Sequence, residues 1–193
     1  MQGMIISNPR LEFLRPMLER WFDCIDRYNA IRGDNETPYW FDEQANLGLL
    51  SAAAWMAEMV TLERSPSKKQ LEEGARNART DLYLATKEER AYIQVTQRWP
   101  RVNSLALTQA LQDIANAAKT ISHASDLKLG CLFVAPQKAQ HSATPEELQD
   151  MLDDLQKEHC CAVAWYFPYA YRKLHNEAGH YHPGVAVLFK EAR

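Results

Sequence analysis

Three polar side chains, Asp81, Gln94 and Thr96, have chemical types and a spacing that could form a site. They fall in two predicted strands joined by a charged turn. If that turn has an even number of residues and is centred on Glu88 and Glu89, Asp81 lies opposite Thr96, with Gln94 as its diagonal neighbour. A carboxylate, an amide and a hydroxyl then converge on one face of a hairpin, an arrangement that suits a binding or catalytic site.

The hairpin itself is predicted from the composition of residues 79–86 and 91–99. Both segments are rich in Leu, Ile, Val, Tyr and Thr, and most of these residue types favour strands. The second segment alternates, with Ile93 and Val95 on one face and polar side chains on the other. The charged residues 87–90 between the two segments predict the turn.

The length and composition fit one soluble globular domain, with 193 residues of which 46% are apolar and 24% charged. The 22 Lys and Arg against 25 Asp and Glu give a net charge of −3, which excludes a uniformly cationic nucleic-acid binder. We expect no membrane span, because no run of about 18 residues is free of polar groups. The start of the chain lacks the features of a signal peptide and the four Cys lack a Cys-x-x-Cys spacing, so a reducing cytoplasm is the expected location.

Apolar residues at helical spacing predict two helices in the first third of the chain, over 9–31 and 42–64. The second is apolar nearly all round, which is typical of a central, buried helix. Glu58 lies in its interior and Glu63 at its end. A buried carboxylate needs a partner, which for Glu58 could be Arg79.

The rest of the chain alternates between helical and strand patterns, with a strong helix start at 144–147, where Thr is the expected N-cap. Helices are predicted over 104–123 and 144–158, and strands over 127–135, 160–167 and 185–189. This order predicts a single α/β domain with a mixed central sheet of about five strands flanked by helices. Within it, 1–41 form an N-terminal helix and loop extension and 42–193 form the core. Strands 127–135 and 160–167, joined through a helix, are expected to be parallel neighbours.

Positive charge is concentrated around the hairpin, since residues 64–101 contain nine Lys or Arg and five Asp or Glu. One interpretation is a solvated face with ion pairs along a helix. The other is a surface that faces phosphate groups. Its candidate nucleic-acid contacts are Lys68, Lys69, Arg76, Arg79, Lys87 and Arg98.

Several of these segments resemble the motifs of the PD-(D/E)XK nuclease superfamily, whose fold is restriction-endonuclease-like. The resemblance is to a bacterial branch with an apolar helix ending in Leu-Glu, a strand with Arg-x-Asp-Leu-Trp/Tyr and a strand with Glu-Ala-Lys-Gln-x-Trp. The corresponding residues here are Leu62–Glu63, Arg79–Tyr83 and Gln94–Trp99, and Tyr181–Leu188 resemble the last strand of that branch. Element order agrees over roughly residues 40–190, so the resemblance implies a nuclease-like core.

In that family, carboxylates bind one or two divalent cations, usually Mg²⁺, which polarise the scissile phosphate and activate a water. A Lys stabilises the developing charge. The resemblance implies that Asp81 corresponds to the metal-binding Asp, and Glu63, or less closely Glu58, to the helix carboxylate. Gln94 stands where the second acid belongs, and Thr96 where the Lys belongs.

These two departures predict an impaired site, because Gln brings no negative charge and Thr cannot supply a cation. We therefore expect a nuclease-fold protein with a degenerate active site, a non-catalytic binding or regulatory module of a bacterial or phage cell, with no cofactor. The alternative is a DNA nuclease that binds Mg²⁺ through Asp81, helped by Lys87 or Arg79 reaching into the site or by Glu58 as a second ligand. A third possibility is DNA binding without cleavage, and the aromatic segments 39–41 and 166–171 could contact a protein partner or a second copy.

Overall fold

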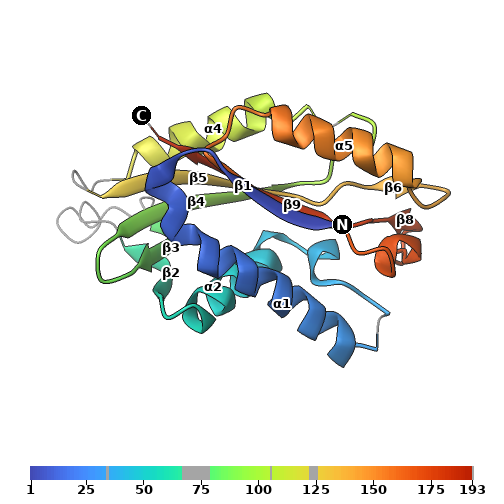
Figure 1. The fold of residues 1–193 in the computed structure, drawn as a ribbon, viewed down its shortest axis with the longest axis horizontal. Coiled ribbons are helices and arrows are strands. Elements are labelled where there is room, and N and C mark those ends of the chain that lie inside the picture. The colour runs from blue at the N-terminus through green and yellow to red at the C-terminus, as the bar shows by residue number, and fades with distance from the viewer. Residues whose placement is uncertain (34, 67–78, 105, 122–125, 193) are drawn as a thin grey trace.

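One mixed sheet of seven strands forms the centre of the molecule, in the order β1-β7-β9-β5-β4-β3-β2 (Figure 1). The computed structural model describes residues 1–33, 35–66, 79–104, 106–121 and 126–192. The strands are β1 Gln2–Ile6, β2 Val60–Pro66, β3 Arg79–Ala85, β4 Arg90–Arg98, β5 Leu127–Val134, β7 Ala162–Tyr166 and β9 Val185–Glu191. β4 and β5 are parallel, and the other neighbours in this sheet are antiparallel. A separate short ladder pairs β6 (Lys138–Ala139) with β8 (His180–Tyr181).

Helices cover both faces of the sheet (Figure 1). The described α-helices are α1 Arg15–Ile31, α2 Glu43–Met56, α4 Thr108–Lys119 and α5 Pro145–Lys157, with short 3₁₀ turns at Pro9–Leu14, Pro38–Trp40 and Tyr171–Lys173. Alternation along β5 separates two cores: Cys131 and Phe133 pack in the core shared with α1 and α2, whereas Leu132 and Val134 pack in the core shared with α4 and α5. Among the described residues, no helix combines the length and apolarity needed to cross a membrane.

The α/β class and the mixed, helix-flanked sheet are as predicted, but the sheet has seven strands rather than about five. The two strands that were not anticipated are its edges, β1 and β2. The expected parallel neighbours, β5 and β7, are not adjacent, because β9 lies between them and is antiparallel to both. The final strand of the chain therefore enters the middle of the sheet, a placement that local sequence patterns do not encode.

The predicted hairpin is present as β3 and β4, but its register differs from the expected one by two residues. Leu82 pairs with Ile93, which brings Asp81 to the level of Gln94 and leaves Thr96 two residues farther along β4. The predicted direct pairing of Asp81 with Thr96 was therefore wrong.

The turn between β3 and β4 explains the shift. It comprises residues 86–89, which lie between the paired Ala85 and Arg90, so its centre lies one residue earlier than expected. The Thr86 hydroxyl accepts hydrogen bonds from the backbone N–H groups of Glu88 (3.2 Å) and Glu89 (2.9 Å). A Ser or Thr hydroxyl that bonds to the backbone in this way stabilises a turn. The threonine thus belongs to the turn and not to the strand.

The prediction of one helix over 42–64 was also wrong, because α2 ends at Met56 and β2 follows. Glu58 has a φ of 60°, in the left-handed region. Its neighbour Met59 donates its N–H to the carbonyl of Ala54 (2.9 Å). This hydrogen bond joins the first and last of six residues, 54–59, at the end of α2. This is a Schellman ending, which usually has Gly at the left-handed position. Because Glu occupies that position here, the sequence contained no stop signal.

Both carboxylates assigned to that helix therefore lie elsewhere. Glu58 is in the turn that ends α2, and Glu63 is on β2, where it pairs with Leu82. Both residues are exposed. The expectation that Glu58 is buried and needs a partner such as Arg79 was wrong, since water solvates it.

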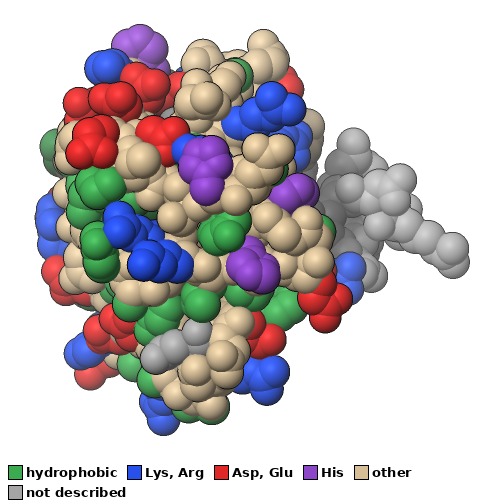
Figure 2. All heavy atoms as spheres, turned by 90° about the vertical axis from the view of Figure 1, so that its right-hand side faces the viewer, with side chains coloured by type: hydrophobic (Ala, Val, Ile, Leu, Met, Phe, Trp, Pro, Cys, Tyr) green, Lys and Arg blue, Asp and Glu red, His purple; other side chains and the backbone are tan. Residues whose placement is uncertain are grey.

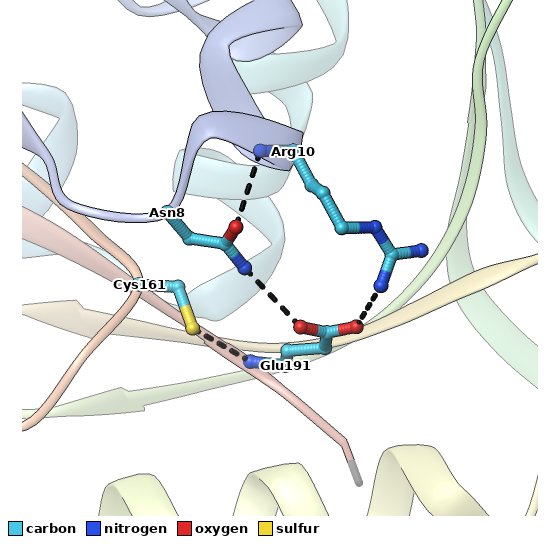
Figure 3. Close-up of polar contacts among 4 residues, drawn as sticks. All are labelled: Asn8, Arg10, Cys161 and Glu191. Carbon is cyan, nitrogen blue, oxygen red and sulfur yellow. Dashed lines mark hydrogen bonds and ion pairs between the residues drawn. The ribbon is translucent and has the colours of Figure 1, made fainter.

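The first residues of the chain are joined to the last strand by polar contacts (Figure 3). The Glu191 carboxylate accepts hydrogen bonds from Asn8 Nδ2 (3.2 Å) and from Arg10 Nη1 (2.5 Å). The N–H of Glu191 in turn donates to Cys161 Sγ (3.4 Å). Residues 1–41 contribute both an edge strand and α1 to the main core, so this segment is part of the same packed body as the hairpin.

Candidate functional site

One carboxylate oxygen is the centre of the predicted site. Asp81 Oδ2 accepts a hydrogen bond from Gln94 Nε2 (2.8 Å) and a second from the backbone N–H of Val95 (2.8 Å). Both donors come from β4, where they directly follow Ile93, the residue that pairs with Leu82 of β3. The Asp side chain thus binds a strand N–H as well as the amide that faces it. The structure thus brings the side chains of Asp81 and Gln94 into direct contact.

Thr96 takes part in a different contact. Its hydroxyl accepts a hydrogen bond from Arg98 Nη1 (3.2 Å), and the same nitrogen donates to the carbonyl of Gln97 (3.0 Å). Alternation places Gln94, Thr96 and Arg98 on one face of β4. Arg98 therefore brings a positive charge next to Thr96.

A second carboxylate near Asp81 was missed by the sequence analysis. It belongs to Glu43, the first residue of α2. Burial and the negative charges of Asp81 and Asp42 raise the pKa of Glu43, while Arg98 and the backbone N–H of Gln97 oppose that rise. Glu43 therefore lies close enough to Asp81 for the two charges to repel each other. Glu43 lies at the beginning of α2, whereas the sequence analysis looked for a carboxylate in the interior or at the end of that helix.

Two buried amides fix the beginning of α2 against β4. Asn46 Nδ2 donates to Gln97 Oε1 (2.8 Å), and Gln97 Nε2 donates to the carbonyl of Phe41 (3.1 Å). Both Asn46 and Gln97 are buried, so these bonds form in a low dielectric and are costly to break. Asp42 caps the helix by accepting from the N–H of Ala45 (3.1 Å). This capped, anchored helix end positions Glu43.

Burial raises the pKa of Asp81, and the N–H of Val95 and the charge of Arg64 oppose that rise. On β2, the neighbours of Arg64 pair with the neighbours of Asp81 on β3, so Arg64 lies at the level of Asp81. The φ of Arg64 is 53°. The distorted strand thus brings a cation toward the carboxylate. Glu58 and Glu63 are both exposed, and neither makes a hydrogen bond to Asp81, Gln94 or Thr96, so the structure does not bring these two residues into the site.

Only some of the predicted phosphate contacts lie within the described residues. Lys68, Lys69 and Arg76 lie outside the described residues, and Arg79 is described only as the first residue of β3. Lys87 lies in the exposed turn of the hairpin, roughly 20 Å from Asp81 at the rise of a strand. It does not reach the site. Of the residues in this set whose side chains are described, Arg98 alone lies beside the site.

The described residues do not fit the cation that the family resemblance implies. Within the described part of the chain, no three His, Cys, Asp or Glu side chains are grouped so that they could hold a metal ion. The Gln94 amide presents its NH₂ group to Asp81 Oδ2, and the reverse orientation would place two oxygens against each other. A donor thus occupies the side of the carboxylate from which a hard cation would otherwise be bound.

No protein-family model matches the chain, and no curated protein and no solved structure matches it either. The residues of the site form a partly buried carboxylate pair, one member of which is bonded to donors of the same chain.

Proposed function

We propose that this chain is a nuclease-fold protein of the PD-(D/E)XK type whose active-site position is degenerate, and that it serves as a non-catalytic binding or regulatory module. The observation that carries the proposal is the double hydrogen bond to Asp81 Oδ2 from Gln94 Nε2 and Val95 N. A family enzyme needs that oxygen for a divalent cation.

The arrangement of elements supports the family assignment. The family places its acidic residues on a helix and on two adjacent strands, and here α2, β3 and β4 bring together Glu43, Asp81 and Gln94. The crossover through α4 then leads to β5, which is parallel to β4. An apolar helix packed on the hairpin is also what the resemblance implies, although its carboxylate differs from the one expected.

The absence of catalysis follows from charge. Gln94 contributes a neutral amide, so a cation at this site would meet less negative charge than in a family enzyme. Thr96 carries no positive charge, and its hydroxyl already accepts a hydrogen bond from Arg98. An Arg is always charged and is held here by two acceptors, so it cannot act as a base. The charges with which a family enzyme binds its cation and stabilises the developing charge are therefore not reproduced by Gln94 and Thr96.

A metal-dependent DNA nuclease is the second candidate, and one observation favours it. Glu43 and Asp81 both have raised pKa values, and the charge of Asp81 contributes to the rise at Glu43. A bound cation would relieve that repulsion. The two candidates therefore differ in whether this pair attracts Mg²⁺ strongly enough to displace the Gln94 amide.

The test is cleavage of plasmid DNA in Mg²⁺ and in Mn²⁺ by the intact chain, by Asp81→Ala and by the double variant Gln94→Glu, Thr96→Lys. We expect no cleavage by the intact chain in either metal. Cleavage in the double variant would support the family assignment, because it restores the two missing charges. Cleavage by the intact chain that disappears in Asp81→Ala would establish the nuclease and refute the non-catalytic module.

A further inference from the structure

A second polar region lies at the opposite end of β4 from the hairpin turn. It is a cavity of about 560 Å³ beyond the carboxyl ends of the parallel pair β4 and β5. Residues 101–103, 137–140, Glu147 and His180 line it. Figure 2 looks onto this end of the molecule, where His, Lys and Arg side chains lie among acidic and hydrophobic ones. In open α/β sheets, ligands bind beyond the carboxyl ends of parallel strands.

The wall of the cavity is held by backbone hydrogen bonds. The N–H of Gln137 donates to the carbonyl of Pro100 (2.8 Å), and the N–H of Val102 donates to the carbonyl of Gln137 (3.2 Å). The side chain of Gln137 also donates to the carbonyl of Trp99 (3.1 Å). The two segments that follow β4 and β5 are thus joined to each other, so the cavity is preformed, as ligand sites usually are.

The charges that line the cavity are unbalanced. Lys138 Nζ is bonded to both carboxylate oxygens of Glu147, and this contact with Lys138 lowers the pKa of Glu147. Lys138 and Glu147 therefore neutralise each other. Arg101 also lines the cavity, and in the described part of the chain its guanidinium has no hydrogen bond and no acidic partner. One uncompensated positive charge remains.

The loop after β6 is held in a strained conformation at the cavity. Gln140 has a φ of 74°, and the N–H of His141 donates to the carbonyl of Ala139 (3.0 Å). A γ-turn with positive φ is rare and strained for a residue with a side chain. A Gly would adopt the same conformation without that cost. Retaining Gln there presents an amide at the cavity, and this amide makes no hydrogen bond within the described structure.

We propose that this cavity binds a small organic phosphate of about nucleotide size. The guanidinium of Arg101 would bind the phosphate, since its planar fork matches phosphate oxygens. His180 lies on the same cavity wall and can donate a further hydrogen bond. The amides of Asn103 and Gln140 would bind the remainder of the ligand. A volume of about 560 Å³ lies in the range of small-molecule sites and exceeds what a lone phosphate ion fills.

The first test is calorimetric titration of the intact chain with inorganic phosphate, ribose 5-phosphate, nucleoside monophosphates and the corresponding nucleosides. We expect the organic phosphates to bind more tightly than inorganic phosphate, and the nucleosides to bind at least about tenfold more weakly than their monophosphates. Binding of inorganic phosphate alone would overturn the proposed ligand class. No binding of any of these compounds, or equal binding of nucleosides and monophosphates, would overturn the site.

Arg101→Ala should weaken binding by about tenfold or more, because it removes the charge that has no partner in the chain. Arg90→Ala is the matched control: this exposed Arg lies at the other end of β4, and its loss changes the net charge equally. Affinity should be unchanged in the control. Equal losses in the two variants would mean that the ligand responds to net charge and not to this cavity.

Gln140→Gly separates binding from folding. Because Gly relieves the strain, we expect the melting temperature to rise while affinity for the organic phosphate falls several-fold. A purely structural role of Gln140 would not produce opposite changes in these two quantities. Unchanged affinity would overturn the assignment of Gln140 to the ligand. These titrations use no DNA and no divalent metal, so they can fail or succeed independently of the nuclease assay.

Discussion

The Asp81 site lies at β4 and the 560 Å³ cavity lies at the segment that follows β4. Their polar side chains differ in whether they are hydrogen-bonded within the chain. At the first, Asp81, Gln94, Thr96 and Arg98 all bond to groups of the same chain. At the second, Arg101, Asn103 and Gln140 line the space, and their side chains make no hydrogen bond within the described residues.

This difference shows that the type of a polar residue does not by itself say whether the residue is available to bind a ligand. A buried carboxylate and an amide suggest chemistry, but a group whose hydrogen bonds are already made stabilises the fold and offers little to a ligand. An uncompensated guanidinium beside a preformed cavity has the reverse properties. The sequence analysis singled out the first region from the types and the spacing of its residues. The structure gives the second region the stronger argument for binding a small molecule.

The largest effect that we predict concerns the cavity end of the molecule, where His182 follows β8 and is 2% exposed. Burial lowers the pKa of His182 to about 4, with a contribution from the charge of His180. In the unfolded chain the pKa of His182 is about 6.5. The stability that comes from keeping His182 neutral is therefore fully present above about pH 6.5 and is lost as the pH falls toward 4. The loss should reach about 3 kcal/mol.

Urea unfolding between pH 4 and pH 7 would measure this loss, with His182→Gln as the comparison. The variant should have a flatter dependence on pH in that range. Equal slopes for the two proteins would show that other groups cause the acid sensitivity.

The next effect concerns the Asp81 site. Gln94→Glu removes a hydrogen bond to a charged group and places a third carboxylate beside Asp81 and Glu43, which should lower stability at pH 7 by about 2 kcal/mol. Mg²⁺ should restore the melting temperature of this variant and leave that of the intact chain unchanged. Thermal unfolding with and without Mg²⁺ checks both statements. Stabilisation of the intact chain by Mg²⁺ to the same extent would show that Gln94 does not block the cation.

A smaller effect concerns Glu58, a predicted site residue that lies away from Asp81 in the turn that ends α2. Glu58→Gly places at the left-handed end of α2 the residue that this position favours, and should raise stability by about 1 kcal/mol. It should change neither DNA binding nor titration with organic phosphates. Glu63→Gln, on the exposed face of β2, serves as a control for charge removal. Loss of a binding activity in Glu58→Gly would return Glu58 to the list of functional residues.

The smallest effect is expected at Asp81 itself. Because burial raises its pKa, the stability that Asp81 contributes is present at low pH and is lost as the pH rises through the raised pKa. Asp81→Asn should remove that loss and gain less than about 1 kcal/mol at pH 7, since the residue is only partly buried. Denaturation at pH 4 and pH 7 measures it. A large loss of stability at pH 7 would mean that the ionised form is needed for folding.

Local sequence patterns were sufficient where a feature depends on neighbouring residues. The hairpin follows from the composition of its strands, and the start of α5 from Thr144, which accepts from the N–H of Glu147 (3.2 Å) while the Glu147 side chain accepts from the N–H of Thr144 (2.8 Å). The same reasoning failed at the end of α2, where a Glu occupies a position that usually has Gly. It also shifted the hairpin register, because Thr86 was assigned to a strand although its hydroxyl closes the turn.

Glu43 shows why the site could be predicted only in part. Its one sequence signal was its position next to Asp42, the residue that caps the apolar helix. That signal does not say which end of the helix faces the hairpin. The buried bond between Asn46 and Gln97 decides it, and these two residues are far apart in the chain.

The sequence by itself determined the α/β class and the strands that carry Asp81 and Gln94. These depend on residue type and local periodicity. Only the tertiary structure decided that β9 lies between β5 and β7, that Glu43 approaches Asp81, and that Arg101 and Gln140 share one cavity. Each of these depends on contacts between distant segments, and such contacts form because buried apolar faces and buried hydrogen bonds must be satisfied together.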